Sequence, residues 1–169
     1  HKHRRRQRQM CIRDSAKADF AVMNSGGVRD SIEAGDITYK DVLTVQPFGN
    51  MVSYVDMSGK EVLDYLNVVA TKPVDSGAYA QFAGITMTVE NGKVSNVFIG
   101  EKQLRLDGQY RFTVPSYNAS GGDGYPKVNT HPGYVNTGFT DAEVLKEFLE
   151  SHSPIDVNEY APSGDIVYK

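Results

Sequence analysis

The sequence has 169 residues, of which 40% are hydrophobic and 23% are charged, a composition typical of a single globular domain with a buried core. Its one cysteine excludes an intrachain disulfide framework and a zinc site built from cysteines. No apolar run approaches the ~20 residues that a membrane-spanning helix requires, so we expect no membrane span.

The net charge of −3 is unevenly distributed along the chain. Residues 1–15 hold six of the 18 Lys and Arg residues but one of the 21 Asp and Glu residues, so this leader carries +5 and the other 154 residues carry −8. Clustered arginines can bind nucleic acid through its phosphates, but the leader has no aromatic residue to stack on a base and no apolar segment of a secretory signal. We therefore predict that residues 1–15 are disordered or non-native and that one folded domain covers residues 16–169.

The first half of this domain alternates between strand and helix patterns. Residues 18–23 predict a buried strand that ends in a glycine-rich loop. A short helix is expected over 38–43, followed by a strand over 51–57. A Ser-x-x-Glu sequence predicts a capping box at Ser58, from which a helix runs to about Ala70.

The second half continues with more strands and a final helix. An Asn-Gly pair between residues 85–89 and 93–99 predicts a β-hairpin. A strand over 110–114 leads into a second polar, glycine-rich loop at 118–125, and a capping box predicts a helix over 141–152. Together these elements predict an α+β fold, a single domain with a mixed β-sheet and flanking helices.

Three loops carry residues suited to a ligand; they cover residues 24–29, 46–50 and 118–125. Arg29 suits a phosphate or carboxylate, because a guanidinium binds oxyanions through two donors. Asp123 can accept hydrogen bonds from sugar hydroxyls. Phe48 and Tyr117 lie beside glycine or small polar residues and suit the stacking of a planar base, which contributes ~1–3 kcal/mol per base. Each residue also has a plain structural interpretation: Phe48 as a core side chain, Arg29 as part of a surface ion pair.

Motifs of a self-sufficient active site are missing. The sequence contains no nucleophile elbow, phosphate-binding P-loop, HExxH motif or dinucleotide fingerprint. A two-metal centre requires several converging Asp, His and Asn ligands, and His131 and His152 are too few for one. We expect no catalytic residue, no metal site and no cofactor in this chain.

Four segments occur in an informative order. They are NSGGVRD at residues 24–30, GDIT at 35–38, QPFGN at 46–50 and YNASGGDGY at 117–125. Together with DSGAY at 75–79 and PGYVNTGF at 132–139, they resemble the C-terminal domain of the 5′-nucleotidase family, in particular its bacterial periplasmic 5′-nucleotidase/UDP-sugar hydrolase branch. The resemblance extends from about residue 18 to the end of the sequence.

The resemblance implies a two-domain parent enzyme. Its N-terminal metallophosphatase domain would hold two divalent metal ions and hydrolyse a nucleoside monophosphate or a UDP-sugar, while the C-terminal domain binds the substrate. The partners it implies for this chain are a nucleotide or nucleoside ligand and that metallophosphatase domain. It also implies a periplasmic or extracellular location. We expect no nucleic-acid partner, because the acidic body of the chain repels polyanions.

The resemblance also implies roles for individual residues. Phe48 and Tyr117 would sandwich the base and Asn50 would bind its edge, while Asp123 would hold the ribose hydroxyls and Arg29 the phosphate. The residues that it places around the substrate are Asn24, Arg29, Phe48, Asn50, Gly77, Tyr117 and Asp123.

The sequence departs from the family pattern at two of these segments. Ser25 stands where the family usually has a glycine, and Tyr117 stands where it usually has phenylalanine. The leader also replaces the upstream region from which family members supply phosphate-binding arginines, so we expect a weakened affinity for phosphate.

Two alternatives remain open. One is a stand-alone module that binds a nucleoside or sugar nucleotide without hydrolase activity. The other is an RNA-associated factor that binds through the basic leader.

Overall fold

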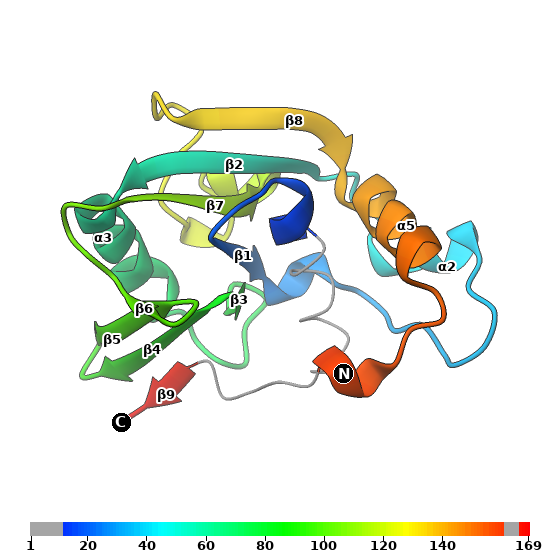
Figure 1. Ribbon diagram of the computed structural model, residues 1–169, viewed down its shortest axis with the longest axis horizontal. Coiled ribbons are helices and arrows are strands. Elements are labelled where there is room, and N and C mark those ends of the chain that lie inside the picture. Colours follow the sequence, from blue (N-terminus) through cyan, green and yellow to red (C-terminus); the bar gives the residue numbers. More distant parts are fainter. Residues whose placement is uncertain (1–11, 161–165) are drawn as a thin grey trace.

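The computed structural model describes residues 12–160 and 166–169 of the chain. A five-stranded sheet runs through the centre of the domain (Figure 1). Its strands, in spatial order, are β3 (Ala80–Ala83), β1 (Phe20–Asn24), β7 (Gln109–Pro115), β2 (Met51–Ser58) and β8 (Tyr134–Thr140). β1 and β7 are parallel and the other neighbours are antiparallel, so the predicted mixed sheet is confirmed.

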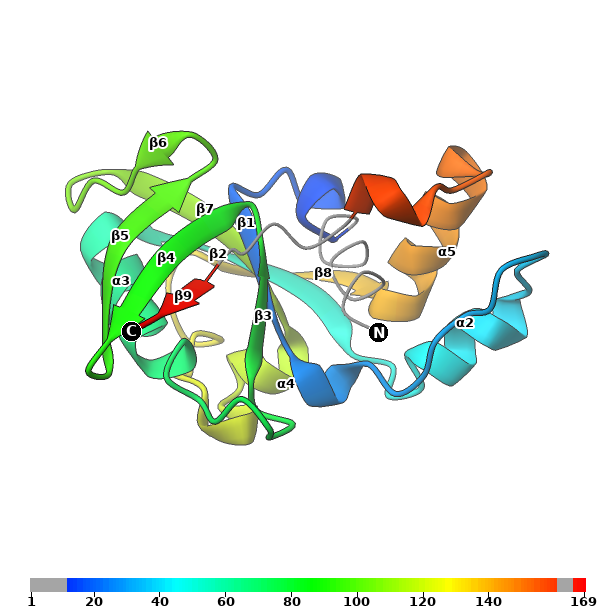
Figure 2. The ribbon, with the colours of Figure 1, turned by 90° about the horizontal axis from the view of Figure 1, so that it is seen from below.

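A second sheet of four strands packs at one end of the molecule, away from α2 and α5 in both ribbon views (Figures 1 and 2). Its order is β6 (Lys102–Gln103), β5 (Lys93–Ile99), β4 (Ile85–Glu90) and β9 (Ile166–Tyr168). β4 and β5 form the predicted hairpin, in which Asn91 and Gly92 have φ values of 50° and 73°. Gly84 links β3 to β4 with a φ of 82°, and a Cβ there would lie 2.8 Å from the carbonyl oxygen of Asp19, so this passage between the two sheets requires glycine.

Helices and short helical turns connect the strands. They are η1 (Ser25–Gly27), α2 (Tyr39–Val45), α3 (Gly59–Val69), α4 (Ser116–Ala119), η2 (Gly122–Gly124), α5 (Asp141–His152) and η3 (Val157–Tyr160). α2, α3 and α5 each begin with a capping box, with Thr38, Ser58 and Thr140 as the respective N-caps. The boxes at Ser58 and Thr140 were predicted. The box at Thr38 was missed because its reciprocal residue is Asp41 in place of the usual Glu or Gln.

The main hydrophobic core fills the space between the two sheets and α3. The rings of Phe20 and Phe112, from the parallel strands β1 and β7, are stacked with their centroids 4.9 Å apart. The apolar stripe of α3, formed by Val62, Leu66 and Val69, is fully buried in the same core cluster. The burial of each of these side chains stabilises the fold by about 1.5–3 kcal/mol.

Residues 12–15, the part of the predicted leader that the structure describes, are helical. Ile12 is buried in a small apolar cluster with Val52, Val144 and Phe148. These residues therefore pack on the domain, and the prediction that the leader is disordered or non-native stays untested for its other residues. Residues 1–11 lie outside the described residues, and the domain start at residue 16 stays a prediction. Among the described residues, no helix is both long and apolar enough to cross a membrane.

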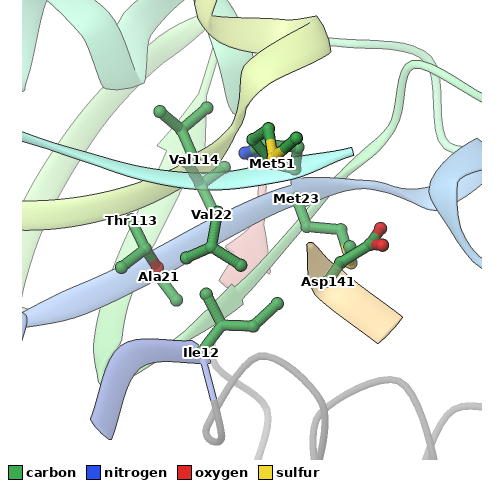
Figure 3. A pocket seen from close by; sticks show the side chains of 10 residues that line it. Ile12, Ala21, Val22, Met23, Met51, Thr113, Val114 and Asp141 are labelled. Carbon is green, nitrogen blue, oxygen red and sulfur yellow. The ribbon is translucent and has the colours of Figure 1, made fainter. Parts of the chain in front are cut away.

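A small pocket of about 10 Å³ is lined by residues of β1, β7 and β2, by Ile12 and by Asp141, the first residue of α5 (Figure 3). Its volume is roughly the space of one water molecule. Asp141 contributes a buried carboxyl to this otherwise largely apolar lining. Its Oδ1 atom accepts a hydrogen bond of 2.9 Å from the backbone N–H of Ala142, while its buried Oδ2 atom has no partner. Burial raises the pKa of Asp141 to about 6, against the opposing effect of the backbone hydrogen bonds.

Replacing Asp141 by asparagine should stabilise the protein at pH 8. Because the pKa of Asp141 is raised in the folded state, the protonated side chain favours the folded protein. This contribution to the free energy of unfolding is complete below pH 4 and is lost as the pH rises to about 6. The substitution removes an ionised, half-paired carboxylate and should increase the free energy of unfolding at pH 8 by roughly 1–3 kcal/mol. Chemical denaturation at pH 8 and pH 4.5 measures this gain, which should shrink at the lower pH.

Asp36→Asn is the control, because Asp36 is exposed and its change should stay within about 0.5 kcal/mol at both pH values. An Asp141→Asn variant that is destabilised at pH 8, or equally stabilised at both pH values, would contradict the effect of burial.

Candidate functional site

The ends of four strands lie side by side at one edge of the five-stranded sheet. β1 and β7 run parallel, so β1 ends at Asn24 and β7 ends at Pro115 on the same edge. β2 and β3 run in the opposite direction and begin there, where Val52 pairs with Pro115 and Ala80 pairs with Asn24. The loops before β2 and β3 therefore meet the loops after β1 and β7, although they are distant in the sequence.

These loops enclose an open pocket with a volume of about 530 Å³, which lies in the range of ~300–1,000 Å³ that is usual for small-molecule sites. Its lining residues are Asn24, Gly26, Gly27, Arg29, Phe48, Asn50, Gly77, Tyr117 and Asp123. The structure thus brings together all seven residues that the sequence singled out. It adds Gly26 and Gly27, which belong to the same loop as Asn24.

Two aromatic rings of the pocket are exposed. Phe48 is 58% exposed and Tyr117 is 47% exposed, so Phe48 is not a core side chain. Arg29 forms no ion pair with any carboxylate among the described residues; its guanidinium carbon lies 5.7 Å from the centre of the Phe48 ring. Neither residue therefore has the plain structural role that was the alternative to ligand binding.

Asp123 is held by a hydrogen bond on each carboxylate oxygen. The side-chain amide of Asn24 donates to Oδ2 at 2.6 Å, and the hydroxyl of Tyr117 donates to Oδ1 at 3.0 Å. Asp123 has a φ of 58°, a left-handed conformation that aspartate tolerates better than most residues. The hydrogen bond to Asp123, together with its negative charge, raises the pKa of Tyr117, because both disfavour the phenolate.

Glycines allow the loops to approach one another. The backbone N–H of Gly26 donates to the carbonyl oxygen of Gly77 at 2.9 Å, and a Cβ on Gly26 would lie 3.3 Å from that oxygen. A Cβ on Gly122 would lie 2.6 Å from the Tyr117 ring, so the ring rests directly on the Gly122 backbone. Ser25 is not among the lining residues and donates its hydroxyl to the carbonyl oxygen of Tyr79 at 3.0 Å.

Two supporting residues were missed by sequence reasoning. The ammonium group of Lys72 donates a hydrogen bond to the carbonyl oxygen of Gly124 at 2.8 Å. The hydroxyl of Tyr125 donates one to the backbone carbonyl oxygen of Ala78 at 2.9 Å. Both contacts tie the loop after β7 to the segment before β3. No local sequence pattern predicts these contacts, because the two residues of each hydrogen bond are about 50 positions apart in the sequence.

The two histidines considered for catalysis lie outside the pocket lining. The Nδ1 atom of His131 accepts the backbone N–H of Gly133 at 2.9 Å, which leaves its Nε2–H to donate to Glu61 at 3.1 Å. The ring of His152 stacks on Phe148 at 4.2 Å. Within residues 12–160 and 166–169, no group of three or more His, Cys, Asp or Glu side chains could hold a metal ion.

Comparison with known proteins identifies the family. The family model described as "5′-nucleotidase, C-terminal domain" matches residues 7–130. This chain belongs to the 5′-nucleotidase C-terminal domain family. The predicted resemblance and fold class are thereby confirmed.

Relatives of this domain are longer proteins. A 5′-nucleotidase of Vibrio parahaemolyticus is 88% identical over 156 residues, which are 92% of this chain and 28% of that protein. The protein UshA of Escherichia coli is 53% identical, also over 92% of this chain and 28% of that protein. The crystal structure of a 5′-nucleotidase precursor from Thermus thermophilus superposes with a TM-score of 0.79 at 29% identity, over 96% of this chain and 34% of that one. The chain therefore spans about a quarter to a third of the relatives it matches.

Replacing Asp123 by asparagine should lower the pKa of Tyr117 toward the ordinary tyrosine value near 10, because the carboxylate that disfavours the phenolate loses its charge. The titration can be followed by NMR on protein labelled at the tyrosine Cζ carbons, with Tyr117→Phe used to assign the signal. Asp107→Asn is the control, since Asp107 pairs with Arg105 and does not line the pocket. A Tyr117 pKa that Asp123→Asn leaves unchanged would mean that the hydrogen bond does not form in solution.

Proposed function

We propose that this domain is the substrate-binding part of a 5′-nucleotidase and that it holds a nucleotide or nucleoside in the pocket at the sheet edge. The observation that carries the proposal is the convergence of four loops on one pocket that contains two exposed aromatic rings, one arginine and one carboxylate. These groups match the parts of a nucleotide, which has a flat base, a hydroxylated sugar and an anionic phosphate.

In this arrangement the base stacks between Phe48 and Tyr117, and the side-chain amide of Asn50 binds its edge. One face of Tyr117 rests on the Gly122 backbone, which leaves the opposite face for the base. Asp123 accepts hydrogen bonds from the ribose hydroxyls. Asn24 and Gly77 complete the wall of the pocket.

The phosphate would bind Arg29. This guanidinium has no carboxylate partner among the described residues, and it lies beside the Phe48 ring. A single guanidinium binds an oxyanion through two parallel hydrogen bonds. We therefore expect phosphate to add to the affinity that the base and sugar provide, but not to dominate it.

Hydrolysis belongs to the rest of the protein in this proposal. The described residues offer no side-chain cluster that fits a metal ion, and the chain covers 28% of its Vibrio relative. We place two divalent metal ions and the cleavage of the phosphoester on an N-terminal metallophosphatase domain. The substrates would be nucleoside monophosphates or UDP-sugars, and the whole protein would work in the periplasm or outside the cell.

Calorimetric titration of the chain with AMP tests the binding pocket. We expect saturable binding that Phe48→Ala weakens by roughly 1–3 kcal/mol, or about 5- to 150-fold, because one face of the base loses its stacking partner.

Phe139→Ala is the matched control. Phe139 is a similarly exposed phenylalanine, at 61%, but it lies on β8 and outside the pocket lining, so its removal should leave the affinity unchanged. An equal loss of affinity for AMP in Phe48→Ala and Phe139→Ala would refute the assignment of this pocket. So would the absence of binding heat at millimolar AMP.

A further inference from the structure

Asp123 is the one carboxylate among the residues that line the described pocket, and its orientation is fixed before any ligand binds. Its oxygens are separately anchored, Oδ2 by the amide of Asn24 and Oδ1 by the hydroxyl of Tyr117. Its backbone is in a left-handed conformation within a short helical turn. The side chain therefore presents one defined face to the pocket.

The two anchors leave a specific hydrogen-bonding capacity. An ionised carboxylate has about four acceptor positions, two on each oxygen. Asn24 and Tyr117 each occupy one of them on different oxygens, so among the described residues each oxygen keeps one position without a partner. Two adjacent acceptors match two adjacent hydroxyl donors, and the sugar next to the base in a ribonucleotide presents such a pair in its 2′ and 3′ hydroxyls.

We propose that Tyr117, in addition to stacking on the base, is a positioning residue whose hydroxyl fixes Asp123 so that the pocket selects ribonucleotides over 2′-deoxyribonucleotides. This inference rests on the proposed function, because it assumes that a nucleotide occupies the pocket. A 2′-deoxyribose brings one ring hydroxyl and leaves one oxygen of the aligned carboxylate without its partner. A site built to bind a hydroxyl discriminates strongly against an analogue that lacks it.

The Tyr117 ring is well placed for this double role. Its face lies against the Gly122 backbone and its hydroxyl is bound to Asp123, so neither the ring nor the carboxylate can turn without breaking a contact. Loss of the hydroxyl would leave the aromatic face in place while releasing Oδ1. Stacking and sugar selection are therefore separable by one atom.

The test compares AMP with 2′-deoxy-AMP by calorimetric titration of the full chain and of Tyr117→Phe. The unchanged protein should prefer AMP by about tenfold or more. In Tyr117→Phe this preference should fall by about two- to tenfold, the effect of one hydrogen bond, because AMP binds more weakly while 2′-deoxy-AMP binds almost as before. A role limited to folding or stacking would weaken both ligands equally and leave their ratio unchanged.

Tyr79→Phe is the control, because it removes a tyrosine hydroxyl whose partner among the described residues is the Tyr168 hydroxyl at 3.3 Å and which lies outside the pocket lining. The ratio of AMP affinity to 2′-deoxy-AMP affinity in this variant should equal that of the unchanged protein. Asp123→Asn is a second variant, and it should abolish most of the preference. If AMP binds and Phe48→Ala weakens it, but Tyr117→Phe keeps the full preference, this inference fails and the proposed function stands. If AMP does not bind at all, both fail.

Discussion

The parallel pairing of β1 with β7 is the constraint on which the rest of the structure depends. Phe20 aligns with Phe112 and their rings stack in the main core, so the two strands are fixed in register by buried side chains. Because the strands run in the same direction, their following loops leave the sheet at one edge. The 2.6 Å hydrogen bond between Asn24 and Asp123, 99 positions apart, joins those two loops directly.

The carboxylate of the pocket, Asp123, is held in place by hydrogen bonds from neighbouring side chains. Each anchored polar group has a second contact behind it: Asp123 has Asn24 and Tyr117, and the loop that carries Asp123 is tied down by Lys72 and Tyr125. Such support lowers the entropy lost on binding, since the groups are already oriented. The glycines serve the same end by permitting backbone contacts that a side chain would block.

Local sequence signals predicted the elements whose stability is local. The capping boxes at Ser58 and Thr140 and the Asn91-Gly92 turn are formed by neighbours in the sequence, and all three are present. β8 was missed because it is an edge strand, mostly exposed on both faces and interrupted by a glycine, so it has no alternating pattern. Within the site, ordered motifs identified the residues, but the Tyr117–Asp123 bond follows from an unusual backbone conformation at Asp123 that composition does not reveal.

The chemistry of the pocket limits what the domain can contribute to a hydrolytic enzyme. Its lining holds one carboxylate, which accepts hydrogen bonds from Asn24 and Tyr117, and one arginine, whose guanidinium has hydrogen-bond donors and no acceptor. Neither group is suited to transfer a proton or attack phosphorus. On the proposed function, the energy of base stacking and sugar recognition therefore acts through position alone, by holding the phosphate where another domain can reach it. A domain of this kind improves catalysis only if it keeps the bound nucleotide in one orientation, which is the property that the anchored Asp123 and the two exposed rings supply.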